Sequence, residues 1–96
     1  MLIEIRTFRL VCGADEATFL EADRHVQAEL ASHHAGFIRR TTARAGDGEW
    51  AVVVLWQAEG DADASTAQAA THPATTQLSA FVDPVTERVQ RFHTLD

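Results

Sequence analysis

The amino-acid sequence predicts a single α+β domain, in which a four-stranded antiparallel sheet carries helices on one face. Two observations support this fold class. Strand-like and helix-like patterns alternate along residues 2–95 in the order strand, helix, strand, strand, helix, strand. The chain also has 96 residues, 46% of them apolar and 23% charged, which is typical of one globular domain over residues 1–96.

The first half of the chain predicts a strand followed by a long helix. Residues 2–11, "LIEIRTFRLV", alternate and are rich in β-branched and aromatic residues, as expected of a strand. The segment "CGADEA" then turns, and its Asp15 suits the N-cap of a helix that reaches about residue 34. Along that helix one stripe is apolar, which predicts that the helix packs on the sheet; the stripe holds Phe19, Val26 and Leu30, with Leu20 beside it.

The second half predicts a hairpin, a weaker helix and a last strand. Residues 36–44 and 49–57 are strand-like and are joined by the turn "AGDG". Residues 59–71 form an Ala-rich helix, which ends at His72–Pro73. A short helical segment with Leu78, Phe81 and Val82 comes next, and residues 86–95 are the last strand. This βαββαβ order is the ferredoxin-like plan.

The third strand predicts a homodimer. Its residues 51–56, "AVVVLW", are apolar without alternation, so both of its faces should be buried. Two helices cover only one face of such a sheet. The other face is therefore expected to pack against the sheet of a second copy.

Composition and charge argue against several other partners. The net charge is −6, with 14 acids against 8 bases, and every base is Arg, so no concentrated basic face exists for a nucleic acid. The single Cys12 excludes an internal disulfide and a Cys-rich metal site. No apolar run approaches the roughly 20 residues of a membrane span, and the charged first strand does not resemble a signal peptide. A cytoplasmic protein without a membrane segment is expected.

The adjacent His33 and His34 are interpreted as the end of the first helix. Gly36 follows them where a left-handed residue commonly terminates a helix, and positive charge in a last turn is favoured by the helix dipole. A metal site needs three or four converging ligands, but adjacent helical residues diverge by about 100° and His25 lies about 80° from His33. We expect no metal here; His33 at the rim of a binding pocket is the functional alternative.

Four segments together resemble the antibiotic biosynthesis monooxygenase-like (ABM) family of the dimeric α+β barrel superfamily. They are "IEIRTFRL", "HHAGFIRRT", "VVVLWQAEGDADA" and "HPATTQLSAFVDP", and the resemblance spans essentially the whole chain. It implies a homodimer whose two sheets form a barrel, with a pocket between sheet and helices in each subunit. Some members oxygenate polycyclic phenols to quinones with O₂ and no cofactor, and others bind and degrade haem.

The resemblance argues against the haem-degrading branch for this chain. That branch relies on an Asn on the first strand, a Trp in the second helix and a His after it. The sequence contains no Asn, and Thr7, Gln68 and Leu78 stand at the corresponding positions. Tyr is missing too, so the cofactor-free members that hold substrates with Tyr and Asn match poorly in detail.

Two residues are the candidates for catalysis. Asp23 lies inside the apolar stripe of the first helix, where an acid is costly unless it is paired or faces a cavity. It is either a base in the pocket or the partner of a strand Arg such as Arg9. His72 precedes Pro73 where family members often place pocket residues, and its alternative is a loop His that caps the next helix.

Substrate-binding residues are expected on the strand faces nearest the helices. Thr7 and Arg9 share a strand face with Ile3 and Ile5, which we assign to the helix side, whereas Glu4 and Arg6 would face the partner sheet. Trp56 offers an aromatic wall for a planar ligand, or is simply a core residue. The list of expected binding residues is Thr7, Arg9, Trp56, Gln68 and His33.

The function that follows is a cofactor-independent monooxygenase acting on an aromatic or polyketide-like small molecule. Asp23 or His72 would abstract a proton, and the resulting carbanion or phenolate would react with O₂. A proton-transfer isomerase or cyclase leaves the same sequence trace. A non-catalytic binding or accessory protein of the same fold is the alternative from another class.

Overall fold

A computed structural model describes residues 1–95 of the chain. The elements follow the predicted order, with the second helical region divided in two. In chain order they are β1 (Leu2–Phe8), α1 (Glu16–Glu29), a 3-10 turn η1 (Ala31–His33), β2 (Phe37–Arg44), β3 (Trp50–Trp56), α2 (Glu59–Ala69), α3 (Pro73–Ser79), a 3-10 turn η2 (Pro84–Thr86) and β4 (Arg88–His93).

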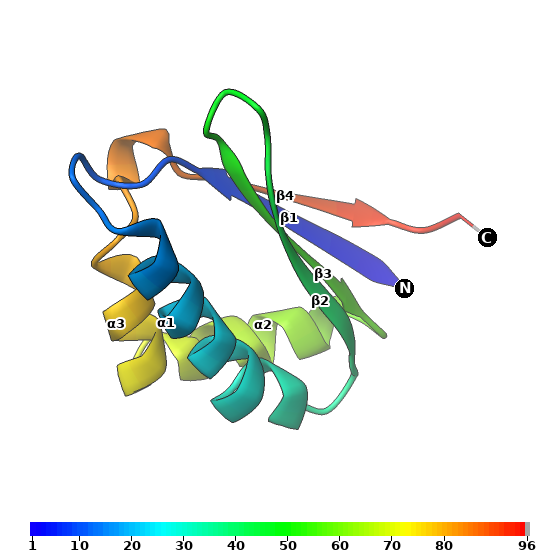
Figure 1. Ribbon diagram of the computed structural model, residues 1–96. Coiled ribbons are helices and arrows are strands. Elements are labelled where there is room, and N and C mark those ends of the chain that lie inside the picture. Colours follow the sequence, from blue (N-terminus) through cyan, green and yellow to red (C-terminus); the bar gives the residue numbers. More distant parts are fainter. Residues whose placement is uncertain (96) are drawn as a thin grey trace.

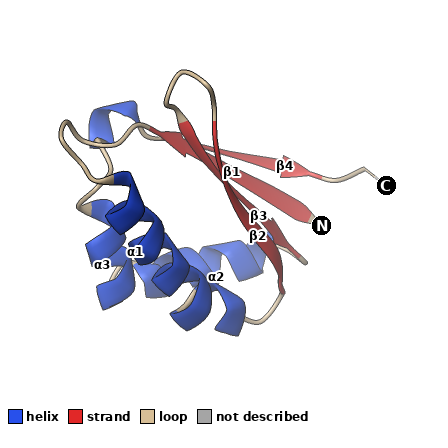
Figure 2. Cartoon of the chain, viewed as in Figure 1, coloured by secondary structure: helices blue, strands red, loops and turns tan. Residues whose placement is uncertain are grey.

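The four strands form one antiparallel sheet in the order β2-β3-β1-β4. All three helices lie on the same side of this sheet, so the molecule has two layers (Figures 1 and 2). This architecture confirms the ferredoxin-like α+β prediction. Within residues 1–95, no helix has the length and apolar character that crossing a membrane requires.

Helix α1 begins as predicted and ends earlier. Asp15 is the N-cap, and its carboxylate accepts a hydrogen bond from the Thr18 backbone N–H at 3.0 Å. The helix stops at Glu29 because Leu30 leaves the helical region (φ −122°, ψ −68°), and the η1 turn follows in place of the predicted last helical turn. The left-handed Gly36 is confirmed, at φ +79°. His33 and His34 thus close the helical segment, as interpreted from the sequence.

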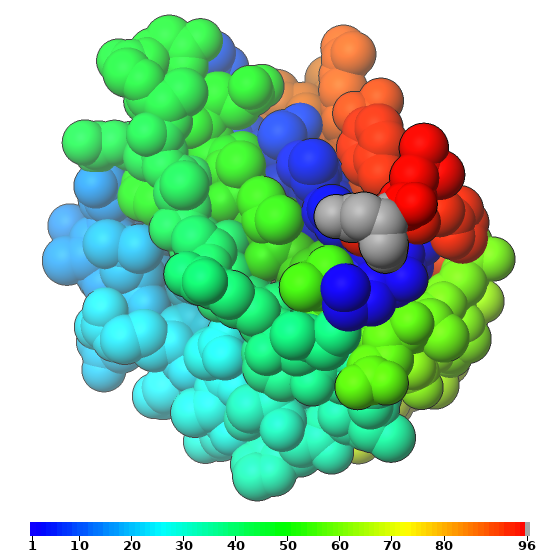
Figure 3. Space-filling view, turned by 90° about the vertical axis from the view of Figure 1, so that its right-hand side faces the viewer, coloured from blue at the N-terminus to red at the C-terminus, as the bar shows by residue number. Residues whose placement is uncertain are grey.

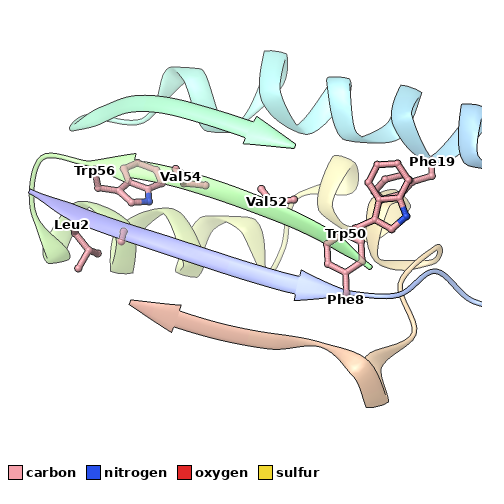
Figure 4. Close-up of a cluster of buried hydrophobic side chains, with 8 residues drawn as sticks. Leu2, Phe8, Phe19, Trp50, Val52, Val54 and Trp56 are labelled. Atoms are coloured by element: carbon pink, nitrogen blue, oxygen red, sulfur yellow. The ribbon is translucent and has the colours of Figure 1, made fainter. Parts of the chain in front are cut away.

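The core between the layers has an aromatic centre at one end of the sheet (Figure 4). Phe19 of α1 packs edge-on against Phe8 of β1 and Trp50 of β3, with ring centroids 5.8 and 4.8 Å apart. Leu2 and Trp56 are buried at the opposite end of the sheet (Figure 4). The aromatic centre fixes α1 over β3, and the space left between the two ends is available for a cavity.

The assignment of the two faces of β1 from the sequence is wrong. Leu2, Glu4 and Phe8 are buried on the helix side, whereas Ile3 and Ile5 point away from the helices. The physical reason is cross-strand pairing: Leu2 lies opposite Trp56 and Phe8 opposite Trp50, whose indoles are covered by the helices. Side chains alternate along a strand, so Glu4 follows Leu2 and Phe8 to the helix side.

The opposite face of the sheet carries no helix. In Figure 3 the strands β2, β3, β1 and β4 succeed one another across the upper half of the view, and the helices lie below them. The strand pairing places on this uncovered face the side chains of Ile3, Ile5, Thr7, Arg39, Thr41, Ala43, Ala51, Val53, Leu55, Arg88, Gln90 and Phe92. Its centre is apolar and half-buried, and Phe92 at its edge is 46% exposed.

Candidate functional site

A cavity of about 410 Å³ lies between the sheet and the helices. This volume falls within the roughly 300–1,000 Å³ of typical small-molecule sites. Most of its wall is apolar, built by Phe8, Val52, Val54 and Trp56 of the sheet and by Val26, Leu30, Ala62 and Leu78 of the helices. An apolar wall of this kind suits the body of a non-polar or aromatic molecule.

An acid, Glu4, lines the sheet side of this cavity and is 9% exposed. Its Oε2 accepts a hydrogen bond from Nε of Arg91 on the neighbouring strand at 2.9 Å. Arg91 also donates from Nη1 to Asp63 of α2 at 2.6 Å. The bond to Asp63, followed by the contacts with Glu4, raises the pKa of Arg91, so that its guanidinium stays positive and holds the Glu4 carboxylate.

Arg40 of β2 also lines the cavity and forms a buried ion pair with Asp23. Its Nη2 lies 2.6 Å from Oδ1 of Asp23, and the other Asp23 oxygen accepts a hydrogen bond from the Thr42 hydroxyl at 2.6 Å. The Arg40 and Asp23 side chains are only 6% and 8% exposed. Asp23 thus has a strand Arg as its partner, which is the paired alternative, although the partner is Arg40 and not Arg9.

The mouth of the cavity is polar. Arg6 of β1 and Glu87, which precedes β4, both line it and form an ion pair 3.0 Å long, with side chains 37% and 33% exposed. Ser65 and Thr66 of α2 and Ser79 of α3 line the cavity as well. Because surface pairs of this kind contribute little stability, the Arg6–Glu87 pair can open to a ligand at small cost.

Two polar atoms on cavity-lining residues are buried without a hydrogen-bond partner among residues 1–95. They are the indole Nε1 of Trp56 and the hydroxyl Oγ1 of Thr75. An unpaired buried polar group costs about 1–3 kcal/mol. Trp56 Nε1 can only donate, whereas the Thr75 hydroxyl can donate or accept. A ligand that brings a carbonyl or phenol oxygen would satisfy either atom.

Of the residues expected to bind substrate, Trp56 is the one that lines the cavity. Thr7 points to the uncovered face of the sheet, contrary to its assignment to the helix side. Arg9 follows β1 and pairs with Asp47 in an exposed turn at 3.0 Å. Gln68 of α2 is exposed and lies outside the cavity lining. The structure therefore does not bring the predicted binding residues together.

His33 and His72 also lie away from the cavity wall. His33 is exposed in the η1 turn. His72 is the N-cap of α3, and its Nδ1 accepts a hydrogen bond from the Ala74 N–H at 3.1 Å. This is the capping alternative considered for His72. A catalytic role for His72 or Asp23 stays a prediction, and both side chains already make structural hydrogen bonds.

Reasoning from the sequence did not select the polar lining residues, among them Glu4, Arg40 and Thr75. Glu4 carried a usable signal, because a lone acid in the apolar strand "LIEIRTF" needs a buried partner. Arg40 could have been inferred as a lining residue from Asp23, because a buried acid requires a cation within reach. Arg39 and Arg40 point to opposite faces of β2, with Arg39 opposite Leu55 on the uncovered side. Nothing in the sequence distinguishes Thr75 from its neighbours.

Comparison with solved structures shows the same fold in oxygenases of known and inferred activity. SnoaB, a cofactor-independent oxygenase from Streptomyces nogalater, superposes with a TM-score of 0.82 at 20% identity, over 99% of this chain and 93% of that one. The "putative antibiotic biosynthesis monooxygenase" from Bordetella bronchiseptica gives 0.81 at 15% identity, over 98% and 96%. Its namesake from Nitrosomonas europaea gives 0.73 at 17% identity, over the full length of both chains. No family model and no curated protein matches the sequence. The chain thus has the ABM-like fold that the resemblance implied.

Proposed function

We propose, from the fold shared with SnoaB and from the cavity, that this protein is a cofactor-independent monooxygenase for an aromatic or polyketide-like small molecule. The single observation that carries the proposal is the composition of the cavity. Its wall is apolar and partly aromatic, and a few buried polar groups punctuate it. Such a site holds a planar ring system and orients its oxygen substituents.

The reaction is written as proton removal followed by attack on O₂. A base removes a proton from a ring carbon or hydroxyl, and the electron pair left on the substrate reacts with O₂. At a ring methylene the outcome is balanced: the carbon loses two hydrogens and gains one oxygen as a ketone, and the second oxygen leaves as water. The substrate itself supplies the electrons, so the scheme requires neither a metal nor a flavin.

The proposed active form is a homodimer. Ile3, Ile5, Val53 and Leu55 form an apolar centre on the uncovered sheet face, and a continuous apolar patch on a monomer is a common sign of a protein interface. Packing this face against its copy would bury both faces of β3, as the unalternating "AVVVLW" predicts. The two cavities lie on the outer side of the paired sheets, next to the helices.

A non-catalytic binding protein of the same fold is the second candidate. One observation favours it: the two bases expected from the sequence, Asp23 and His72, are both engaged in structural hydrogen bonds. In that case Trp56 and the apolar wall would hold a ligand without turnover. A proton-transfer isomerase or cyclase is the remaining alternative within the enzyme class.

Oxygen uptake tests the proposal. Anthrone, a planar tricyclic ketone with an acidic ring methylene, is incubated with the chelator-treated protein, and dissolved oxygen and the quinone product are followed together. Equimolar oxygen uptake and quinone formation would support the monooxygenase. Conversion of the probe into a different product under strict exclusion of oxygen would support the isomerase or cyclase, and binding without any conversion or proton exchange would support the binding protein.

A further inference from the structure

An acid and a guanidinium stand in one row on the sheet side of the cavity. Glu4 of β1 lies opposite Val54 of β3, and Val54 lies opposite Arg40 of β2. All three residues line the cavity, so their side chains project on the same side of the sheet. Adjacent strands are 4.7–4.9 Å apart, which separates the α-carbons of Glu4 and Arg40 by roughly 10 Å. A ring system lying over Val54 would have the carboxylate at one side and the guanidinium at the other.

Glu4 has one carboxylate oxygen available to a ligand. Arg91 holds Oε2, and within residues 1–95 no donor is bonded to Oε1. The clamp by Arg91, itself anchored to Asp63, fixes the orientation of the carboxylate while leaving this second oxygen free. Glu4 therefore meets the geometric requirement for a general base, an oriented acceptor inside the binding cavity.

Arg40 has donors in excess of those that Asp23 uses. The ion pair engages Nη2 of Arg40 with Oδ1 of Asp23, and a guanidinium carries several further N–H groups. Asp23, held in turn by Thr42, keeps Arg40 in place at the cavity wall. A buried and prepositioned cation of this kind is suited to stabilise negative charge that develops on a ligand oxygen.

We propose that Glu4 is the catalytic base of this site and that Arg40 stabilises the enolate or phenolate oxygen formed by proton removal. The inference rests on the proposed function for its substrate, a planar ketone or phenol. In the step proposed, a C–H bond beside the conjugated ring breaks and its proton moves to Oε1 of Glu4. The electron pair shifts onto the carbonyl oxygen, and this oxygen faces Arg40. No oxidant takes part in the step.

The roles differ from those expected of Asp23. Both oxygens of Asp23 already accept hydrogen bonds, and Asp23 is absent from the cavity lining, so it acts as a positioning residue for Arg40. His72 uses its Nδ1 to cap α3. The acids that line the cavity are Glu4 and Glu87. Glu87 lies at the exposed mouth, where it pairs with Arg6, whereas Glu4 lies on the inner wall and keeps one oxygen unbonded.

Proton exchange tests the base directly. Anthrone is incubated with the protein in deuterium oxide without oxygen, and loss of its methylene signal is followed by proton NMR. The expected result is exchange faster than in buffer alone, with the catalysed rate reduced roughly 100-fold or more in Glu4→Gln, which keeps an oxygen for Arg91. Glu16→Gln is the matched control, because it makes the same change in an exposed Glu–Arg pair outside the cavity, and it should stay within about threefold of the parent rate.

A second pair of variants tests Arg40. Arg40→Met alone leaves Asp23 as an unpaired buried acid, so it is compared with Asp23→Leu combined with Arg40→Met, in which apolar residues replace the whole pair. The double variant is expected to melt close to the parent protein and to lose exchange by roughly 100- to 1,000-fold, mainly in kcat. Parent-like exchange in a folded double variant would overturn the role of Arg40.

The outcomes separate this inference from the proposed function. Undiminished exchange in folded Glu4→Gln, or no exchange above buffer in the parent protein, overturns Glu4 as the base. Exchange that depends on Glu4 without oxygen uptake supports Glu4 and overturns the monooxygenase. Oxygen uptake that persists in Glu4→Gln supports the monooxygenase and overturns the base assignment.

Discussion

Nη2 of Arg40 lies 2.6 Å from Oδ1 of Asp23, and both side chains are almost fully buried. The pair connects α1, which carries Asp23, to β2, which carries Arg40. The Arg40 side chain also forms part of the cavity wall. A buried pair of this type contributes little compared with well-packed apolar residues, but loss of one member leaves an uncompensated charge. Replacing one member of the pair is therefore expected to destabilise the protein, whereas replacing both with apolar residues is expected to leave its stability nearly unchanged.

Asp23→Asn is expected to lower the free energy of unfolding by about 3–5 kcal/mol at neutral pH, because Arg40 is left without its carboxylate. Chemical denaturation with urea measures the change, and the melting temperature should fall clearly. The Asp23→Leu, Arg40→Met double variant is the control and should recover most of the loss. An Asn variant as stable as the parent would instead support Asp23 as a desolvated pocket acid.

The uncovered sheet face makes a prediction about assembly. Ile5 lies at the centre of this face on β1, so Ile5→Arg places a charge in the middle of the proposed sheet-to-sheet interface. The parent should have the mass of a dimer by light scattering at micromolar concentration, and Ile5→Arg should have the mass of a monomer, 10.5 kDa. Val85→Arg, at a side chain 91% exposed in η2, should leave the mass unchanged. A monomeric parent protein would contradict the dimer.

The fold was predictable because most of its signals are local in the sequence. The strand pattern of "AVVVLW", the cap at Asp15 and the stop at Gly36 each reflect backbone geometry that few other arrangements satisfy. The boundaries shifted where tertiary contacts decide: η1 replaces the last turn of α1, since Leu30 leaves the helical region to bury its side chain.

The site was harder to predict because β1 is apolar on both faces. Leu2 and Phe8 on one side compete with Ile3 and Ile5 on the other, and the pattern alone does not say which set the helices cover. Pairing with the two tryptophans of β3 decides it. The even-numbered residues of β1 therefore face the helices, so that Glu4 lies in the cavity and Thr7 lies on the uncovered face. A strand with two apolar faces hides its site residues, because register is a tertiary property.

Gly36 is expected to tolerate no side chain, for two reasons. Its φ of +79° strains any residue with a Cβ, and a Cβ there would collide with the Asp61 carboxylate of α2. Gly13 has nearly the same φ, +80°, but open space around it. Gly36→Ala should therefore destabilise the protein more than Gly13→Ala, by thermal denaturation, and Asp61→Gly, which also removes the Asp61 Cβ at 2.7 Å, should relieve the excess. Equal losses in the two Ala variants would show that the collision is absent.

The Asp15 cap gives a pH-dependent prediction. Its hydrogen bonds from the Thr18 hydroxyl and backbone N–H lower the pKa of Asp15 in the folded protein. A folded pKa below the unfolded one stabilises the fold at pH values above the unfolded pKa, and this stabilisation is lost as the pH falls through the folded pKa. Asp15→Ala should be less stable than the parent at neutral pH, and the difference should shrink below about pH 4. A difference constant from pH 7 to pH 2 would contradict the charged cap.

The buried indole N–H of Trp56 predicts where a ligand oxygen binds. Because this donor has no partner among the described residues, a ligand oxygen that accepts from it gains a hydrogen bond without breaking one. Trp56→Phe removes the N–H and keeps an aromatic ring, so the dissociation constant for a dihydroxyanthraquinone, which carries oxygens besides the one that faces Arg40, should rise roughly 2- to 10-fold by equilibrium dialysis. Trp50→Phe makes the same change in the aromatic centre outside the cavity and should leave binding unchanged. Weaker binding in Trp50→Phe but not in Trp56→Phe would place the ligand elsewhere. Thr75→Val, which removes the other unpaired atom, should weaken binding as well, and its effect should add to that of Trp56→Phe if each atom binds a different ligand oxygen.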